Sequence, residues 1–167
     1  MVYYFTSSVV DPPGFIYVGK DKFENEDLIQ YGWEEDIWFH VDKLSSAHIY
    51  LRTTDPQQQP WDSLPEALVK DLAQLTKANS IEGNKKDNIT VIYTPWSNLK
   101  KDGSMDVGQV SFKDARKVKR VLVPARENAI VNRLNKTRVE RKPDLKQERE
   151  DRLKELRKRE VEALQAR

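Results

Sequence analysis

The sequence predicts an α+β fold: a mostly antiparallel sheet covered by helices, followed by a charged C-terminal helix that protrudes. Short runs of β-branched and aromatic residues alternate with turn residues, as strands do. Two other segments have the capping residues or the apolar spacing of helices. The order strand–strand–helix–strand–strand–helix–strands favours an antiparallel sheet over alternating parallel βαβ units.

The first elements follow from local signals. "VYYFTSSVV" (2–10) and "FIYVG" (15–19) flank "DPPG", which predicts two strands joined by a turn. A short helix is expected over 21–32, because Asp21 and Glu24 form a capping-box pattern and Gly32 follows as a stop.

The middle of the chain predicts two more strands, at 36–41 and 48–53, and then a polar loop at 54–63. Leucines 68, 72 and 75 share one face, so an amphipathic helix is expected over 64–80. The remaining elements expected before Pro124 are a strand at 88–94, a loop at 98–108, and strands at 109–112 and 118–123.

After Pro124, residues 125–141 are expected to be helical, with Ile130 and Leu134 on one face and Pro143 as an interruption. Residues 144–167 are charged helix formers with a thin leucine seam, too short to define a coiled coil firmly. The helix has no stop signal at its end, which is compatible with a longer natural chain. We therefore divide the chain into an α+β domain (1–123) and a basic helical extension (124–167).

Composition excludes several classes of protein. The chain has no cysteine, which removes disulfides, thiolate metal sites and a cysteine nucleophile. We expect no membrane-spanning segment, because no apolar run approaches the roughly 20 residues needed. The N-terminus lacks a basic region before its apolar residues, so a signal peptide is not expected and a cytoplasmic location is.

Charge divides the chain unequally. Residues 1–112 hold 10 Lys and Arg against 17 Asp and Glu, whereas residues 113–167 hold 19 against 10. Such asymmetry is typical of a basic region that meets a polyanion, although a solvated charged helix would explain it equally well.

Both histidines lie in "DIWFHVDKLSSAHIYLR", residues 36–52. Strand alternation places Ile37, Phe39, Val41, Ile49 and Leu51 on one face, where they form a core. The other face receives Asp36, Trp38, His40, Asp42, His48, Tyr50 and Arg52. If the strands pair around Leu44, His40 lies opposite His48, Trp38 opposite Tyr50, and Asp36 opposite Arg52.

This second face has the residue types of an acid–base site. Histidine titrates near neutrality, and a neighbouring carboxylate can fix its tautomer. Trp38 and Tyr50 offer surfaces on which a base can stack, and Arg52 can hold a phosphate through two hydrogen bonds. Such clusters also occur as purely structural pairs, and both interpretations remain open.

A metal site is a further alternative. His40 and Asp42 have the His-x-Asp form of a facial triad, with His48 as the second histidine. In oxygenases of that type the second histidine comes from a distant strand of a jelly roll, which this chain is too short and too helical to build. We therefore expect no metal and no cofactor.

Four ordered blocks, "GKDKFENEDLI", "DIWFHVDKLSSAHIYLR", "NITVIYTPWSNLKK" and "VGQVSF", resemble the NFACT-R domain of proteins that act in ribosome-associated quality control. The resemblance covers roughly residues 1–123. It implies nucleic acid as a partner, with tRNA and the large ribosomal subunit favoured. For vertebrate relatives it also implies DNA binding and an alternative, membrane-associated location. Long members tend to have a Gly-Ser-His-like run where this chain has "SSAH", which bears on the backbone of that loop.

The positions that match the family pattern are Lys20, Asn25, Asp36, Trp38, His40, His48, Lys100 and Lys101.

Three functions remain open. The first is metal-independent cleavage of peptidyl-tRNA near its 3′ end on stalled large subunits, with His40 and His48 as base and acid and with Asp36 and Asp42 orienting them. In that hypothesis Arg52, Lys100 or Lys101 holds the phosphate. The second is a non-catalytic RNA- or DNA-binding module that uses Lys20 and the basic tail. The third is a scaffold that acts through the 144–167 helix.

Overall fold

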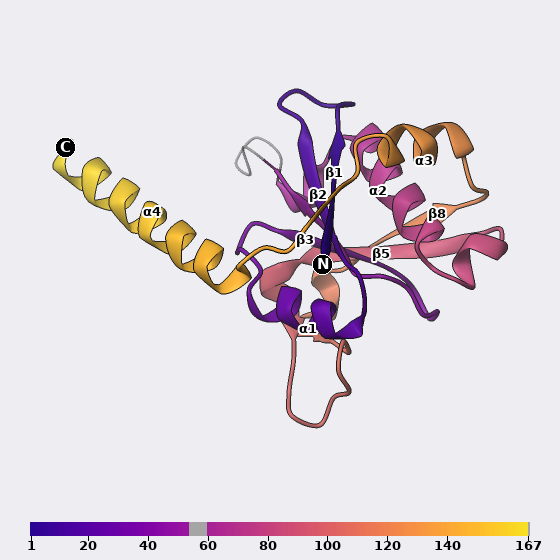
Figure 1. The fold of residues 1–167 in the computed structure, drawn as a ribbon, viewed down its shortest axis with the longest axis horizontal. Helices are drawn as coiled ribbons and strands as arrows, with labels where there is room; N and C mark the ends of the chain where they lie inside the picture. Colours follow the sequence, from indigo (N-terminus) through magenta and orange to yellow (C-terminus); the bar gives the residue numbers. More distant parts are fainter. Residues whose placement is uncertain (54–59, 167) are drawn as a thin grey trace.

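The computed structural model describes residues 1–53 and 60–166. It confirms the predicted α+β class, with a seven-stranded, antiparallel sheet, a two-stranded sheet and a C-terminal helix that projects from the body (Figure 1). The helices are α1 (Lys22–Gln30), α2 (Glu66–Ala78), α3 (Asn128–Asn135) and α4 (Leu145–Gln165). The strands are β1 (Val2–Ser7), β2 (Gly14–Gly19), β3 (Ile37–Val41), β4 (Ile49–Arg52), β5 (Ile89–Pro95), β6 (Leu99–Lys100), β7 (Ser111–Phe112), β8 (Lys119–Val123) and β9 (Val139–Arg141).

The large sheet has the strand order β8-β5-β3-β4-β2-β1-β9. The first strands and α1 form as predicted, and the Asp21 side chain caps α1 by accepting a hydrogen bond from the Glu24 N–H at 2.9 Å. The expected β3–β4 register is also confirmed, because Trp38 pairs with Tyr50, and Ile37 with Leu51. In the connecting loop the positive φ, 65°, falls on Lys43 rather than on the serines.

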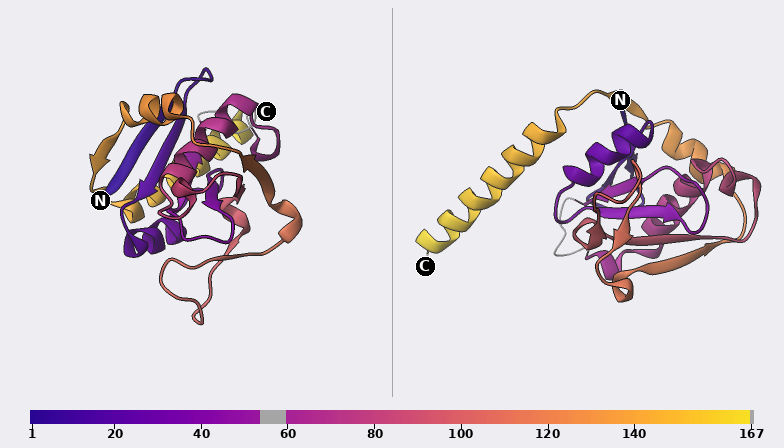
Figure 2. Two further views of the ribbon diagram at one scale, coloured as in Figure 1. Left: turned by 90° about the vertical axis from the view of Figure 1, so that its right-hand side faces the viewer. Right: turned by 90° about the horizontal axis from the view of Figure 1, so that it is seen from below.

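One face of the sheet carries the main hydrophobic core. Residues 37, 39, 41, 49 and 51 pack there against α2, whose three predicted leucines are fully buried. Leu134 of α3 joins the same core. Figure 2 shows α2 and α3 on this side of the sheet and α1 on the other.

The prediction of a helix over 125–141 is wrong for the second half of that range. Helix α3 ends at Asn135, and Val139–Arg141 instead pairs with β1 as the edge strand β9. Thr137 explains the break, since its hydroxyl donates to the Leu134 carbonyl at 2.6 Å and accepts from the Thr6 N–H at 2.9 Å. This side chain competes with the next helical turn and turns the chain toward β1.

The positive charge is concentrated before the protruding helix. Residues 113–142, here called the basic segment, hold 11 Lys and Arg against 3 Asp and Glu, a net charge of +8. Residues 143–167 hold 8 against 7. The tail is therefore nearly neutral overall, and the excess lies in the part of the chain that forms β8, α3 and β9.

Candidate nucleic-acid site

The second face of the sheet, which carries the histidines, is also covered. Trp38 and Tyr50 lie in a smaller core with Leu28 of α1, Leu99 of β6 and Ile92 of β5. Both rings are buried, at 3% and 0% exposed. The expectation that they offer open stacking surfaces does not match this arrangement, because α1 and the 96–118 segment cover them.

The histidines do lie together. The ring centroids of His40 and His48 are 5.2 Å apart, at nearly a right angle. Trp38 contacts both rings, stacking on His40 at 5.3 Å and meeting His48 edge-on at 5.5 Å. His40 is half-buried and His48 is 5% exposed, so only the first histidine has a substantial path to solvent.

Hydrogen bonding and burial bear on the protonation of the two rings. His40 Nδ1 lies 2.5 Å from the Val41 carbonyl, which can only accept, so Nδ1 carries the proton and Nε2 is left with a lone pair. Burial lowers the pKa of His40, opposed by that hydrogen bond and by Asp42. Burial, with His40 and Lys101 nearby, lowers the pKa of His48 to about 3, so its imidazole is neutral at physiological pH.

Asp36 has other partners. Its carboxylate, 0% exposed, accepts two hydrogen bonds from Arg52, at 2.8 and 2.7 Å, one from the Trp33 N–H at 2.9 Å, and one from the Tyr17 hydroxyl. The predicted Asp36–Arg52 pair is thus present. Because the carboxylate is occupied by these groups, the geometry argues against a role for Asp36 in orienting a histidine.

Arg52 also lies between two aromatic rings. Its guanidinium is 3.5 Å from the centre of the Trp33 ring and 4.8 Å from that of Tyr17. Tyr17 in turn stacks on Tyr50 at 4.8 Å. A guanidinium held by a carboxylate and two rings is a structural element, and it is not presented to a phosphate.

The charge of Asp42 acts on the pKa of His40, but Asp42 forms an ion pair with Arg120 of β8 at 2.5 Å. Among the described residues, no group of three His, Asp or Glu side chains is arranged to hold a metal ion. The facial-triad alternative therefore has no geometric support here.

The predicted lysines divide into two kinds. Lys20 and Lys100 are exposed. Lys101 is enclosed instead, since its ammonium donates to the carbonyls of Asp106 at 2.6 Å and Gln109 at 2.9 Å and pairs with Glu26 at 2.9 Å. It therefore fastens the 101–109 loop to α1, and its charge helps to lower the pKa of His48.

Several polar atoms under this cover are unsatisfied. Trp38 Nε1, Tyr50 OH, His48 Nδ1 and Asn25 Oδ1 are buried without a hydrogen-bond partner among the described residues. Asn25, a predicted binding residue, is 7% exposed and lies against Gly19. Unpaired buried polar groups cost free energy and are retained most readily where a ligand or water pairs with them.

Sequence reasoning missed a second set of residues. The guanidinium groups of two arginines of α4 lie over tryptophan rings. Arg152 is 4.9 Å from the centre of the Trp33 ring, and Arg149 is 4.8 Å from that of Trp96. Arg152 also pairs with Glu35 at 2.6 Å. The spacing of these arginines, three residues apart on one helix face, was the available signal, but nothing local indicated the tryptophans as their targets.

The fold and site define an α+β module with a histidine pair beside lysines. The sequence matches the family model of the NFACT protein RNA binding domain over residues 1–114, and the chain belongs to that family, as the motif resemblance predicted. No helix in the described ranges combines the length and apolarity needed to cross a membrane.

Relatives match this chain over most of its length. "Coiled-coil domain-containing protein 25" of Danio rerio is 59% identical over 157 residues, which cover 94% of this chain and 75% of that protein. "Protein JLP2" of Saccharomyces cerevisiae is 44% identical over 144 residues, covering 84% and 69%. The C-terminal part of a fibronectin/fibrinogen-binding protein from Streptococcus suis has the same fold, with a TM-score of 0.61 at 20% identity over 81% of this chain and 48% of that one.

Proposed function

We propose that this protein binds RNA and acts on the 3′ end of peptidyl-tRNA, cleaving it to release the nascent chain from stalled large ribosomal subunits. Membership of an RNA-binding domain family supports the binding part. The observation that carries the cleavage part is the pair of adjacent imidazoles, whose ring centroids are 5.2 Å apart.

The chemistry requires no metal. His40 Nε2 takes the proton of a ribose 2′-OH, the 2′-oxygen attacks phosphorus, and the 5′-oxygen leaves with a proton, giving a 2′,3′-cyclic phosphate. His48 is neutral in the free protein and so cannot donate that proton. A phosphate bound beside it raises its pKa, since a neighbouring negative charge favours the imidazolium.

The burial of His48 also supports a second candidate, a non-catalytic RNA- or DNA-binding module. In that case the histidines serve packing under α1, and exposed lysines such as Lys20 and Lys100 hold phosphates. Affinity would then fall steeply with salt, by about 0.7 in log K per phosphate contact on single strands for each unit of log salt.

The test is incubation of the purified protein with peptidyl-tRNA, with and without EDTA, followed by mapping of any new 3′ end. Cleavage that persists in EDTA, and that His40→Gln abolishes while RNA binding stays, supports the enzyme. Intact peptidyl-tRNA with normal binding leaves only the binding module. Lys85→Gln, a change at an exposed lysine of the 3-10 turn Gly83–Lys85, is the control for nonspecific loss of charge.

A further inference from the structure

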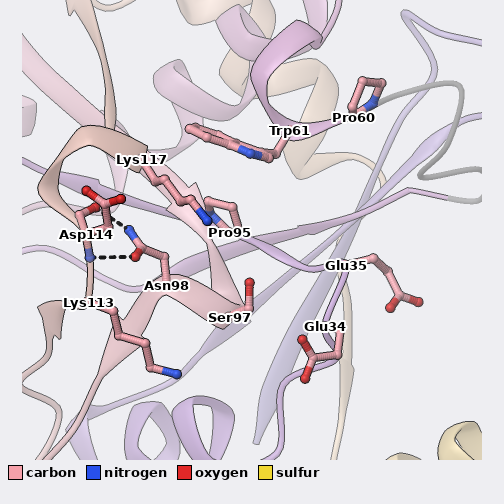
Figure 3. Close-up of a pocket in the computed structure, with 10 residues that line it drawn as sticks. All are labelled: Glu34, Glu35, Pro60, Trp61, Pro95, Ser97, Asn98, Lys113, Asp114 and Lys117. Atoms are coloured by element: carbon pink, nitrogen blue, oxygen red, sulfur yellow. Dashed lines mark hydrogen bonds between the residues drawn. The ribbon is translucent and has the colours of Figure 1, made fainter.

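A hollow of about 430 Å³ lies at the end of β5. Figure 3 shows Trp61 over one side, Glu34 and Glu35 on another, and Lys113 and Lys117 extending into it from the segment before β8. Pro95, Ser97 and Asn98 form its floor. This volume is in the range of sites that take one small organic ligand.

The lysine wall is held firmly in place. Asn98 accepts from the Asp114 N–H and donates to the Asp114 carbonyl, both at 2.9 Å. The Lys113 N–H donates to the Asn98 carbonyl at 2.9 Å, and the Lys117 carbonyl accepts from the Thr94 hydroxyl. The backbone of both lysines is thus fixed to the end of β5, so a ligand would not have to order it.

Some charged side chains in the hollow have an ion-pair partner and others do not. Glu35 pairs with Arg152, and Asp114 is bound by Arg116. Within the described ranges, the side chains of Lys113, Lys117 and Glu34 have no hydrogen bond or ion pair. Two ammonium groups without a partner among the described residues therefore face one such carboxylate across the hollow, which directs an anionic group to the lysine side.

The aromatic wall is a single indole. Trp61 is half-exposed and its ring meets Tyr93 edge-on at 6.3 Å, which leaves ring surface open to the hollow. The short turn that carries it, Trp61–Ser63, is tied down because Lys119 donates to the Asp62 carbonyl at 2.5 Å. A fixed, partly exposed indole beside two ammonium groups suits a flat ring that bears a phosphate.

We propose that this hollow binds one nucleotide of a single-stranded RNA, with the base on Trp61 and the phosphate between Lys113 and Lys117. An adjoining hollow of about 290 Å³ shares Ser97 and Lys113 with it and reaches Lys101. A strand that continues from the first hollow into the second runs toward Lys101, whose charge lowers the pKa of His48. The inference rests on the proposed RNA-binding function and adds a site that positions the substrate.

The probe is adenosine 5′-monophosphate, titrated into the full-length protein while the indole N–H signals are followed by NMR. Trp61→Phe identifies the Trp61 signal. We expect a saturable shift of that signal, about tenfold weaker binding of adenosine without phosphate, and about fivefold weaker binding in Lys113→Ala and in Lys117→Ala. Lys136→Ala is the matched control, because Lys136 is an exposed lysine of the same basic segment that does not line the hollow, and it should change affinity less than twofold.

Three results would overturn the proposal: an unmoved Trp61 signal, saturation by inorganic phosphate at the same concentration as the nucleotide, or equal weakening in Lys136→Ala. The proposed function is judged separately, with peptidyl-tRNA. If the nucleotide leaves Trp61 unmoved while RNA is still bound and cut, only the nucleotide site is wrong. If Trp61 responds to the nucleotide but RNA is neither bound nor cut, the nucleotide site stands and the proposed function is wrong.

Discussion

The buried histidine makes stability depend on pH in a calculable way. His48 has its pKa lowered to about 3 from an ordinary 6.5, with burial as the largest cause. Between these two values the unfolded chain binds a proton that the folded protein does not, so the free energy of unfolding falls as pH falls below 6.5. From pH 7.5 to pH 5.0 this single group lowers it by about 2 kcal/mol.

The assay is urea unfolding of the wild type and His48→Gln at both pH values, with equal denaturant slopes as the check on two-state behaviour. Glutamine has a similar size and a polar side chain but does not titrate, so the loss between pH 7.5 and 5.0 should shrink by about 2 kcal/mol in this variant. The absolute stability at pH 7.5 can change in either direction without affecting this difference.

His40→Gln is the matched control. The pKa of His40 is lowered as well, mainly by burial, but its hydrogen bond to Val41 and the charge of Asp42 oppose the shift. The His40→Gln substitution should therefore remove less of the pH dependence of the free energy of unfolding than His48→Gln does. Equal pH dependence in the wild type and His48→Gln, or an NMR titration of His48 with a pKa above 6, would refute the reasoning.

Three further predictions concern the surroundings of the site. Arg52→Met leaves the fully buried Asp36 carboxylate without its counter-charge and should lower the free energy of unfolding, measured in urea, by about 3–5 kcal/mol. The double variant with Asp36→Asn should recover much of this loss, and no recovery would contradict the pairing argument. Gly32→Ala places a Cβ 2.2 Å from a neighbouring tryptophan ring and should cost about 1–3 kcal/mol, while Gly103→Ala, with nothing within 4 Å, should cost little; equal losses would count against the packing argument. Deletion of 144–167 removes 8 basic and 7 acidic residues, so the slope of log K for RNA against log salt should change by less than about 1, and a larger change would place the phosphate contacts on the tail.

The alternation of side chains between the two faces of the β3–β4 hairpin allowed most of the site to be predicted from the sequence. A period of two assigns each side chain to a face, and the symmetric placement of residues around Leu44 was enough to predict the Trp38–Tyr50 pairing and the Asp36–Arg52 contact. The cover over the second face was not predictable in this way. Helix α1 buries only Asn25, Leu28 and Ile29, too few to mark an amphipathic helix.

The contacts of Trp33 and Trp96 with the arginines of α4 could not be predicted from the sequence for a different reason. Trp33 and Trp96 are separated from Arg149 and Arg152 by at least fifty residues. Trp33 lies in irregular chain and Trp96 in a three-residue 3-10 turn, so no periodicity assigns either to a face. Contacts of this kind depend on where the chain returns after β9, which itself replaced an expected helix. The tryptophans could be recognised as unusual, but their partners required the fold.

The position of the basic segment in the sheet bears on whether its positive charge serves to bind RNA. It forms both edges of the large sheet, β8 at one side and β9 at the other. Charged side chains on edge strands also keep sheets from pairing with each other, and both edges expose an apolar residue, Leu122 at 59% and Val139 at 45%. Edge protection can account for charge on the strands themselves, such as Lys119 and Arg120, but it does not account for Lys113 and Lys117, which precede β8 and line the hollow. Phosphate binding is therefore better sought at that end of the segment than along the edges.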